Sequence, residues 1–94
     1  MSKVEFTYRP TREPIEQPGR VMRESVAAVL AGAYELSRAK GYQAGIEIRK
    51  DGVPIYDEEA INSAVDRINR LVNLEKFSVE QAAERVAKED GHSA

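Results

Sequence analysis

The clearest structural signal in this 94-residue chain is the segment 46–56, which reads Ile46-Glu47-Ile48-Arg49-Lys50-Asp51-Gly52-Val53-Pro54-Ile55-Tyr56. Apolar and polar residues alternate on both sides of Asp51-Gly52, a dipeptide that tolerates the positive φ angles of a two-residue type I′ turn. The segment therefore predicts a β-hairpin. Its expected cross-strand pairs are Lys50 with Val53, Ile48 with Ile55, and Glu47 with Tyr56.

The hairpin also predicts where its strands lie in a sheet. Pro54 has no amide proton to donate to a ladder, so we expect the second strand of the hairpin at a sheet edge. The register predicts a buried face that contains Ile46, Ile48 and Ile55. The open face of the sheet is expected to carry Glu5, Thr7, Glu47, Arg49 and Tyr56.

A second alternating segment, 4–9, stands near the start of the chain. It predicts a strand whose core face carries Val4, Phe6 and Tyr8. This strand is expected to stop at Pro10, which cannot donate to a ladder.

Three other segments have apolar residues at helical spacing. The first helix is predicted over 19–40, before Gly41, which suits a left-handed C-cap. Asp57 is a favourable N-cap for the second helix, and Ser78 with Gln81 predicts a capping box for a short third helix. The element order β-α-β-β-α-α predicts an α+β fold, with a three-stranded, largely antiparallel sheet and helices packed on one face.

The length and the prolines indicate how the chain is organised. Ninety-four residues suit one domain, which we expect over 1–90. The prolines at 10, 14 and 18 predict an extended arm over 10–18, between the first strand and the first helix, because each one disfavours helix at its predecessor. Residues 91–94 are expected to form a flexible tail.

The composition narrows the class of protein. The chain has no cysteine, which excludes disulfides and thiolate chemistry and favours a cytoplasmic protein. Its longest apolar run, 26–33, is too short to cross a bilayer, so no membrane association is expected. The net charge of −2 gives no general attraction to nucleic acid. Residues 1–56 carry nine Lys/Arg against seven Asp/Glu and residues 57–94 carry five against nine, an asymmetry that could orient one subunit on another.

The sequence offers little for catalysis, and we expect no enzyme, no cofactor and no metal site. The single histidine, His92, falls in the predicted tail, and no serine lies in a nucleophile elbow. No glycine spacing matches a phosphate-binding loop. The acidic cluster Asp57-Glu58-Glu59 could hold a hard cation, but an N-cap and a first turn that suit the helix dipole already explain it.

Four arginines near the arm form a candidate ligand site: Arg9, Arg12, Arg20 and Arg23. The predicted helix over 19–40 would place Arg20 and Arg23 in its first turns, where local electrostatics disfavours cations. Arginines that converge on a helix N-terminus make a good phosphate or carboxylate site. The alternative is that Glu13, Glu16 and Glu24 neutralise them in surface pairs.

The first helix also carries small residues at near four-residue spacing, which let another backbone come close. The candidate oligomer interface consists of Ala28, Ala31, Gly32 and Glu35. The competing explanation is that the small residues pack on the domain's own sheet. Gly32 costs about 1 kcal/mol relative to Ala in a helix interior, so a packing reason for it is expected.

These features favour a non-catalytic protein–protein interaction or regulatory module, such as an inhibitor, that acts as a homo-oligomer. Short acidic chains that block a partner are common in phages and mobile elements, which fits this hypothesis. The alternative is a module that binds a phosphate-containing ligand or nucleic acid through the arm arginines and the N-terminus of the first helix.

The apolar stripe of the second helix makes a first prediction. Replacing Ile68 with Asp should unfold the domain, because an unpaired charge would enter the core. The same change at the neighbouring Arg67 is expected to be nearly silent. Thermal unfolding of both variants checks this, and equal melting temperatures would show that the stripe is not the buried face.

Overall fold

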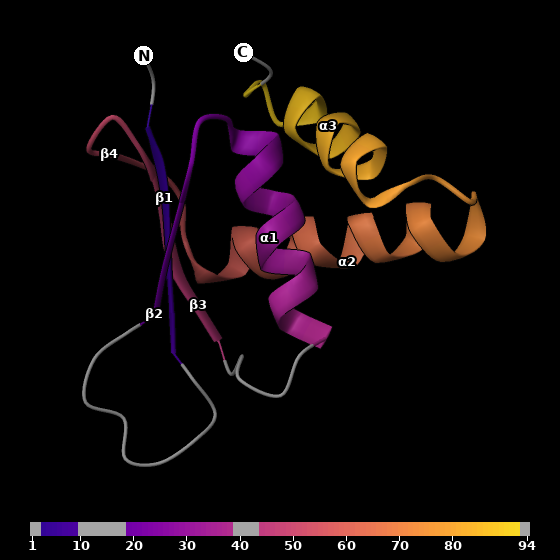
Figure 1. Cartoon of the computed structure of the whole chain (residues 1–94), viewed down its shortest axis with the longest axis horizontal. Coiled ribbons are helices and arrows are strands. Elements are labelled where there is room, and N and C mark those ends of the chain that lie inside the picture. Colours follow the sequence, from indigo (N-terminus) through magenta and orange to yellow (C-terminus); the bar gives the residue numbers. More distant parts are fainter. Residues whose placement is uncertain (1–2, 10–18, 39–43, 93–94) are drawn as a thin grey trace.

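The computed structural model describes residues 3–9, 19–38 and 44–92. Its elements form a four-stranded antiparallel sheet with three helices (Figure 1). The strand order is β2-β1-β3-β4, so β1 and β3 lie inside the sheet. The elements are β1 (Val4–Arg9), β2 (Gly19–Arg23), α1 (Val26–Arg38), β3 (Ala44–Lys50), β4 (Val53–Tyr56), α2 (Glu58–Leu74) and α3 (Val79–Glu89).

The α+β class is confirmed, but the prediction of three strands is wrong. Residues 19–23, predicted as the start of the first helix, form strand β2 and pair antiparallel with β1. The helix begins only at Val26, after Ser25, whose Oγ accepts from the Ala28 amide at 3.1 Å. Arg20-Val21-Met22-Arg23 has no strong preference of its own, and pairing with β1 decides its conformation.

Gly19 is required by this pairing. It lies opposite Tyr8 of β1, whose ring occupies the place that a Cβ on residue 19 would take. Any other side chain there would displace the ring. The predicted arm over 10–18, with Arg12, lies outside the described residues.

The predicted hairpin turn is confirmed, but the predicted strand register beyond Lys50 and Val53 is wrong. Asp51 and Gly52 have φ angles of 52° and 84°, and Lys50 lies opposite Val53 as predicted. A bulge then shifts the register, so that Ile48 lies opposite Tyr56. The predicted pairs Ile48–Ile55 and Glu47–Tyr56 are therefore wrong.

The bulge decides which side chains enter the core. Tyr56, expected on the open face, is 4% exposed, whereas Ile55 is only partly buried. A second irregularity, between β1 and β3, leaves Ile46 without an opposite residue and only partly buried. In both cases one extra residue in a strand changes the side to which its neighbours point.

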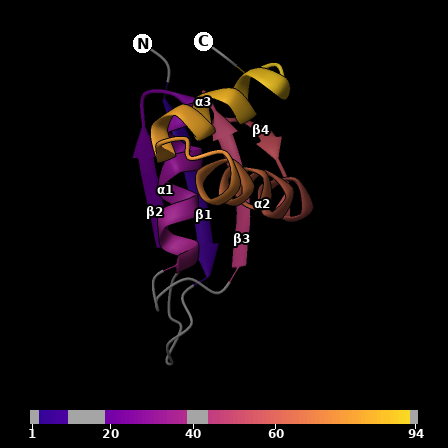
Figure 2. The ribbon, with the colours of Figure 1, turned by 90° about the vertical axis from the view of Figure 1, so that its right-hand side faces the viewer.

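The helices lie on one face of the sheet, as predicted (Figure 1). Figure 2 shows α1 in front of β1 and β2, and Figure 1 shows α2 running away from the sheet. α3 contacts α1 and α2 rather than the strands. The core between these layers includes Phe6, Leu30, Ile48, Ile61 and Ile68, each fully buried.

The predicted helix ends are confirmed for α2 and α3. The Asp57 side chain accepts from the Ala60 amide, and Ser78 and Gln81 form the capping box. At the end of α3, Gly91 has a φ of 79°, and the His92 amide donates to the Ala87 carbonyl at 2.8 Å. This is a Schellman-type ending, and it holds His92 next to the helix.

A polar network joins β4, α2 and α3 at their meeting point. The Tyr56 hydroxyl donates to Asp90 Oδ2 at 2.6 Å, and Arg67 donates to both Asp90 oxygens at 2.9 and 3.0 Å. Burial and the Asp90 hydrogen bond raise the pKa of Tyr56 well above its ordinary value. Burial alone would raise the pKa of Asp90, but the Arg67 and Tyr56 hydrogen bonds outweigh burial and lower it.

This network overturns the expectation that Arg67→Asp would be silent. The Arg67 side chain is only 31% exposed, and an aspartate there would face Asp90 and Glu89 in place of their cation. The neighbouring stripe is as predicted, with Ile61, Ala64 and Ile68 buried.

A second prediction follows for Asp90. Asp90→Asn should lower the free energy of unfolding by about 1–3 kcal/mol at pH 7, because the bidentate bonds lose their ionic character. The lowered pKa means that the contribution of Asp90 is present above its unfolded-state pKa of about 3.9 and is lost as the pH falls through the folded pKa. Urea unfolding of both proteins should therefore show a difference that shrinks below about pH 4.

The matched control is Glu89→Gln. Glu89 also faces Arg67, at 3.5 Å, but its side chain is 49% exposed. This change should cost less than about 1 kcal/mol. Equal costs for the two variants would show that the network does not stabilise the fold.

Candidate functional site

The candidate arginines do not converge on the first helix. Arg9 is exposed at the end of β1, and Arg20 and Arg23 lie on β2, so none of these three is in the first turn of α1. The Arg20 Nε lies 3.0 Å from Glu5 Oε2 across the two strands. Arg23 Nη1 donates to the Met22 carbonyl at 2.8 Å. Arg20 therefore has a surface ion pair, but with Glu5 and not with any of the three glutamates expected from the sequence.

Among the residues that the structure describes, β2 bonds to β1 on one side and to no strand on its other side. The Asp51 amide donates to the Lys3 carbonyl at 2.9 Å, which marks 3 and 51 as a hydrogen-bonded pair. Hydrogen-bonded pairs occur at every second residue of an antiparallel ladder, so the odd-numbered residues of β1 bond to β3. The even-numbered residues of β1 therefore direct their amides and carbonyls toward β2. Val21 lies opposite Phe6, so the amide and carbonyl of Val21 bond to β1. Arg20 and Met22 consequently direct their amides and carbonyls outward.

Gly32 of α1 lies beside this edge, because a Cβ on it would meet Val21 Cγ1 of β2, and Ala28 and Glu35 share its stripe of the helix. Val29, Leu30 and Ala33 point into the core, whereas Ala28, Ala31 and Gly32 are partly exposed and Glu35 is exposed. Figure 2 shows α1 above β2 at one border of the molecule, with α2 on the other side. Ala31 points elsewhere and packs against the core cluster. We call the outward edge of β2 together with Ala28, Gly32 and Glu35 the β2–α1 flank.

Gly32 does not need to be glycine for packing within the chain. A Cβ built on it meets only Val21 Cγ1, at 3.7 Å, among the described residues. That distance is an ordinary van der Waals contact, so alanine would fit. The explanation that this small residue is imposed by the domain's own sheet is therefore not supported.

The open face of the sheet, on the side opposite the helices, meets the flank at the edge of β2. Register places Arg20 beside Thr7 and Glu47, and Met22 beside Glu5 and Arg49. Arg49 also pairs with Glu47 along β3. The face thus carries balanced, mutually paired charges, and none of its described residues offers an aromatic ring that could stack on a nucleic-acid base.

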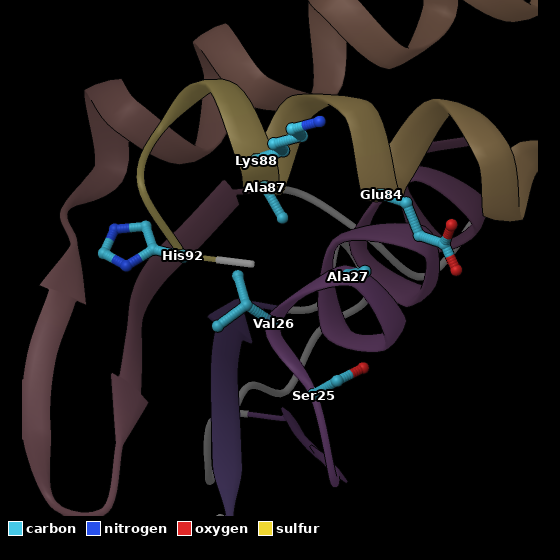
Figure 3. Close-up of a pocket in the computed structure, with 7 residues that line it drawn as sticks. All are labelled: Ser25, Val26, Ala27, Glu84, Ala87, Lys88 and His92. Carbon is cyan, nitrogen blue, oxygen red and sulfur yellow. The ribbon is translucent and has the colours of Figure 1, made fainter. Parts of the chain in front are cut away.

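A cavity of about 300 Å³ lies between the start of α1 and the end of α3 (Figure 3). The Ser25 hydroxyl at its rim already caps α1, and the His92 ring lies 5.3 Å from the Tyr56 ring. Figure 3 shows the Ser25 and His92 side chains pointing away from each other. The cavity therefore does not pair a nucleophile with a base. Its lining consists of Ser25, Val26, Ala27, Glu84, Ala87, Lys88 and His92.

The acidic cluster at the start of α2 behaves as a helix terminus. Asp57 Oδ1 accepts from the Ala60 amide at 2.8 Å, which leaves Glu58 and Glu59 exposed in the first turn. Within the described ranges, no three His, Asp or Glu side chains are grouped as metal ligands.

No protein-family model, curated protein or solved structure matches this chain. No helix in the described parts of the chain is long and apolar enough to cross a membrane. The proposed function therefore rests on the geometry of the flank and not on similarity to another protein.

The sequence predicts an interface on α1, which stays a prediction, and it does not predict the strand β2 beside that helix. The signal for β2 was the alternation of Arg20, Val21, Met22 and Arg23, which also fits the start of an amphipathic helix. The Tyr56–Asp90–Arg67 network had no sequence signal, because its members are brought together only by the bulge and by the packing of α3.

A third prediction concerns Gly32. Gly32→Ala should raise the free energy of unfolding of the monomeric chain by about 0.5–1 kcal/mol, since alanine is the better helix former and its Cβ has room. Denaturant unfolding at low protein concentration measures this. Destabilisation would mean that the α1 backbone lies closer to β2 than the 3.7 Å contact indicates.

Proposed function

We propose that this chain is a non-catalytic protein–protein interaction module that binds its partner along the β2–α1 flank. The supporting observation is the position of a free strand edge beside a helix flank whose side chains are small. Unpaired amides and carbonyls of an edge strand are a template for an added strand. The small residues of α1 leave room above it.

The two edges of the sheet are not equally suited to this role. β4 has four residues and contains Pro54, which removes a donor and blunts the edge. β2 has five residues and no proline. Arg23 covers the outward carbonyl of Met22, so a partner strand has to displace one side-chain hydrogen bond.

The side chains around β2 add a preference in charge. Arg20 and Arg23 are both exposed, and β2 has no acidic residue. A partner that presents carboxylates beside the added strand would be favoured. We include in this proposal a regulatory or inhibitory role and a cytoplasmic location, which suits a fold that needs no disulfide.

The alternative, a phosphate or nucleic-acid site built from the arm arginines, has less support. It relied on Arg20 and Arg23 at the N-terminus of the first helix, and both lie on β2 instead. Arg20 is also engaged by Glu5.

A fourth prediction tests the proposed function. Tagged full-length chain is mixed with untagged chain and with a lysate of cells that express it, and retained proteins are compared between the wild type and Ala28→Arg. Ala28 is partly exposed on the flank, so the substitution should leave the fold intact and block close approach. We expect at least one retained protein, either the untagged chain or another, to be lost with Ala28→Arg.

The matched control is Asn62→Arg, an exposed position on α2 away from the flank. It adds the same charge to a helix surface and should retain the same proteins as the wild type. If no retained protein depends on Ala28, or if both variants lose it equally, the proposed function is wrong. Circular dichroism melts of both variants verify that they are folded.

A further inference from the structure

Resting on the proposed function, we propose that the partner on the β2–α1 flank is a second copy of this chain. The two copies are related by a two-fold axis at Val21, so that the two β2 strands pair antiparallel. The result is one continuous eight-stranded sheet with the two α1 helices side by side above it. The register of β2, the position of α1 and the charges at positions 23 and 35 all suit this two-fold pairing.

The backbone of β2 is self-complementary about Val21. Arg20 and Met22 both direct their amides and carbonyls outward, and they are the residues on either side of Val21. A two-fold axis at Val21 places Arg20 opposite Met22 of the second copy, and Met22 opposite Arg20. Each pair exchanges two hydrogen bonds, so every outward group in the middle of β2 is satisfied. The Met22 carbonyl gains a backbone amide in place of the Arg23 side chain.

The position of α1 sets the spacing of the two helices. α1 contacts both β2 and β1 and lies above them. Strands in a sheet are about 4.8 Å apart, so a helix centred between β2 and β1 lies about 5 Å from the two-fold axis. The two α1 helices would then lie about 10 Å apart, which is at the upper end of the range for packed helices. The small side chains of Ala28 and Gly32 fit between the helices at this spacing without a clash.

The same register brings opposite charges together. α1 runs back along β2, and nine residues of helix separate Val26 from Glu35, a rise of about 13 Å. Four residues of strand separate Arg23 from Gly19, also about 13 Å. Glu35 is therefore level with Gly19.

Antiparallel pairing places Arg23 of the second copy opposite Gly19, and hence beside Glu35. Arg23 lies opposite the buried Val4, so its side chain starts from the helix side of the sheet. Neither Arg23 nor Glu35 has an ion-pair partner among the residues that the structure describes. The two-fold axis creates this Arg23–Glu35 pair twice.

This arrangement also accounts for Gly32. Alanine would fit within the single chain and would favour the helix, so the glycine has a cost without a benefit there. In the dimer, Gly32 lies on the stripe of α1 nearest the neighbouring helix, where the absence of a side chain allows the two helices to approach closely.

The test is the mass of the purified full-length chain by sedimentation equilibrium, with charge reversal at the two positions. The wild type should have twice the chain mass of 10.5 kDa, or 21 kDa. Arg23→Glu and Glu35→Arg should each weaken dimerisation about tenfold or more, because each creates two like-charge contacts. The double variant Arg23→Glu with Glu35→Arg should recover most of the loss, since the pairs reform with their signs exchanged.

Matched controls reverse charges elsewhere. Arg70→Glu and Glu59→Arg, both on α2, change exposed residues away from the flank and should leave the dimerisation constant unchanged. A dimer that is insensitive to positions 23 and 35, or a double variant without recovery, would overturn this geometry.

A second measurement needs no variant. In the wild type, amide hydrogen exchange at Arg20 and Met22 should slow as the protein concentration rises, because these amides become bonded across the dimer. The Val21 amide, which bonds to β1 in either state, should change much less.

A chain that stays monomeric at millimolar concentration, with concentration-independent exchange at Arg20 and Met22, overturns the proposal of a second copy. If another protein is still retained in a manner that depends on Ala28, the proposed function stands and its partner is that protein. If nothing is retained, both proposals fail.

Discussion

The pairing of β1 along both of its sides is the constraint on which the rest of the structure depends. β1 bonds to β2 on one side and to β3 on the other, and its side chains Val4 and Phe6 are fully buried. With β1 inside the sheet, β2 and β4 are left as the edges. The chain leaves β2 into α1, which therefore covers the β2 side, and it leaves β4 into α2, which covers the other. Because this strand order leaves β2 at an edge with α1 above it, the described part of the chain leaves the β2–α1 flank uncovered.

One extra residue in β4 makes possible a second connection, which links β4 with α2 and α3. The bulge between the hairpin strands turns Tyr56 into the core, where its hydroxyl meets Asp90 at the end of α3 and Arg67 of α2. Because Asp90 accepts from both, it links a strand, a long helix and the last helix through a single carboxylate. α3 contacts the sheet little, so this link and the apolar contacts with α1 and α2 fix its place.

The outward edge of β2 is partly shielded by a side chain, yet it keeps backbone groups that an added strand could bond. Edge strands in natural proteins are commonly shielded by charged side chains, and Arg23 shields β2 in this way by covering the Met22 carbonyl. A single exposed side-chain hydrogen bond contributes little to stability, so the shield can be displaced by a strand that offers several backbone bonds. The same arginine can thus keep β2 from pairing indiscriminately and still favour a partner with a carboxylate in the right place.

The sequence alone determined the local structure wherever a residue's own chemistry was sufficient. Asp51-Gly52 fixed the turn through its positive φ angles, Asp57 and Ser78 fixed two helix starts through their side-chain oxygens, and Pro54 marked an edge strand. It also pointed to the small residues of α1, although not to what lies beside them. In each case the deciding interaction spans only a few residues, so it can be seen in a short window of sequence.

Only the tertiary structure decided the identity of β2, the two bulges and the network around Asp90. Arg20-Val21-Met22-Arg23 fits a helix or a strand, and it becomes a strand because β1 offers a row of unpaired backbone groups. The bulges depend on how two strands and the helices above them fill space together, and one extra residue then reverses which side chains are buried. Contacts between residues far apart in the chain settle these features, and a pattern of neighbouring residues carries no information about them.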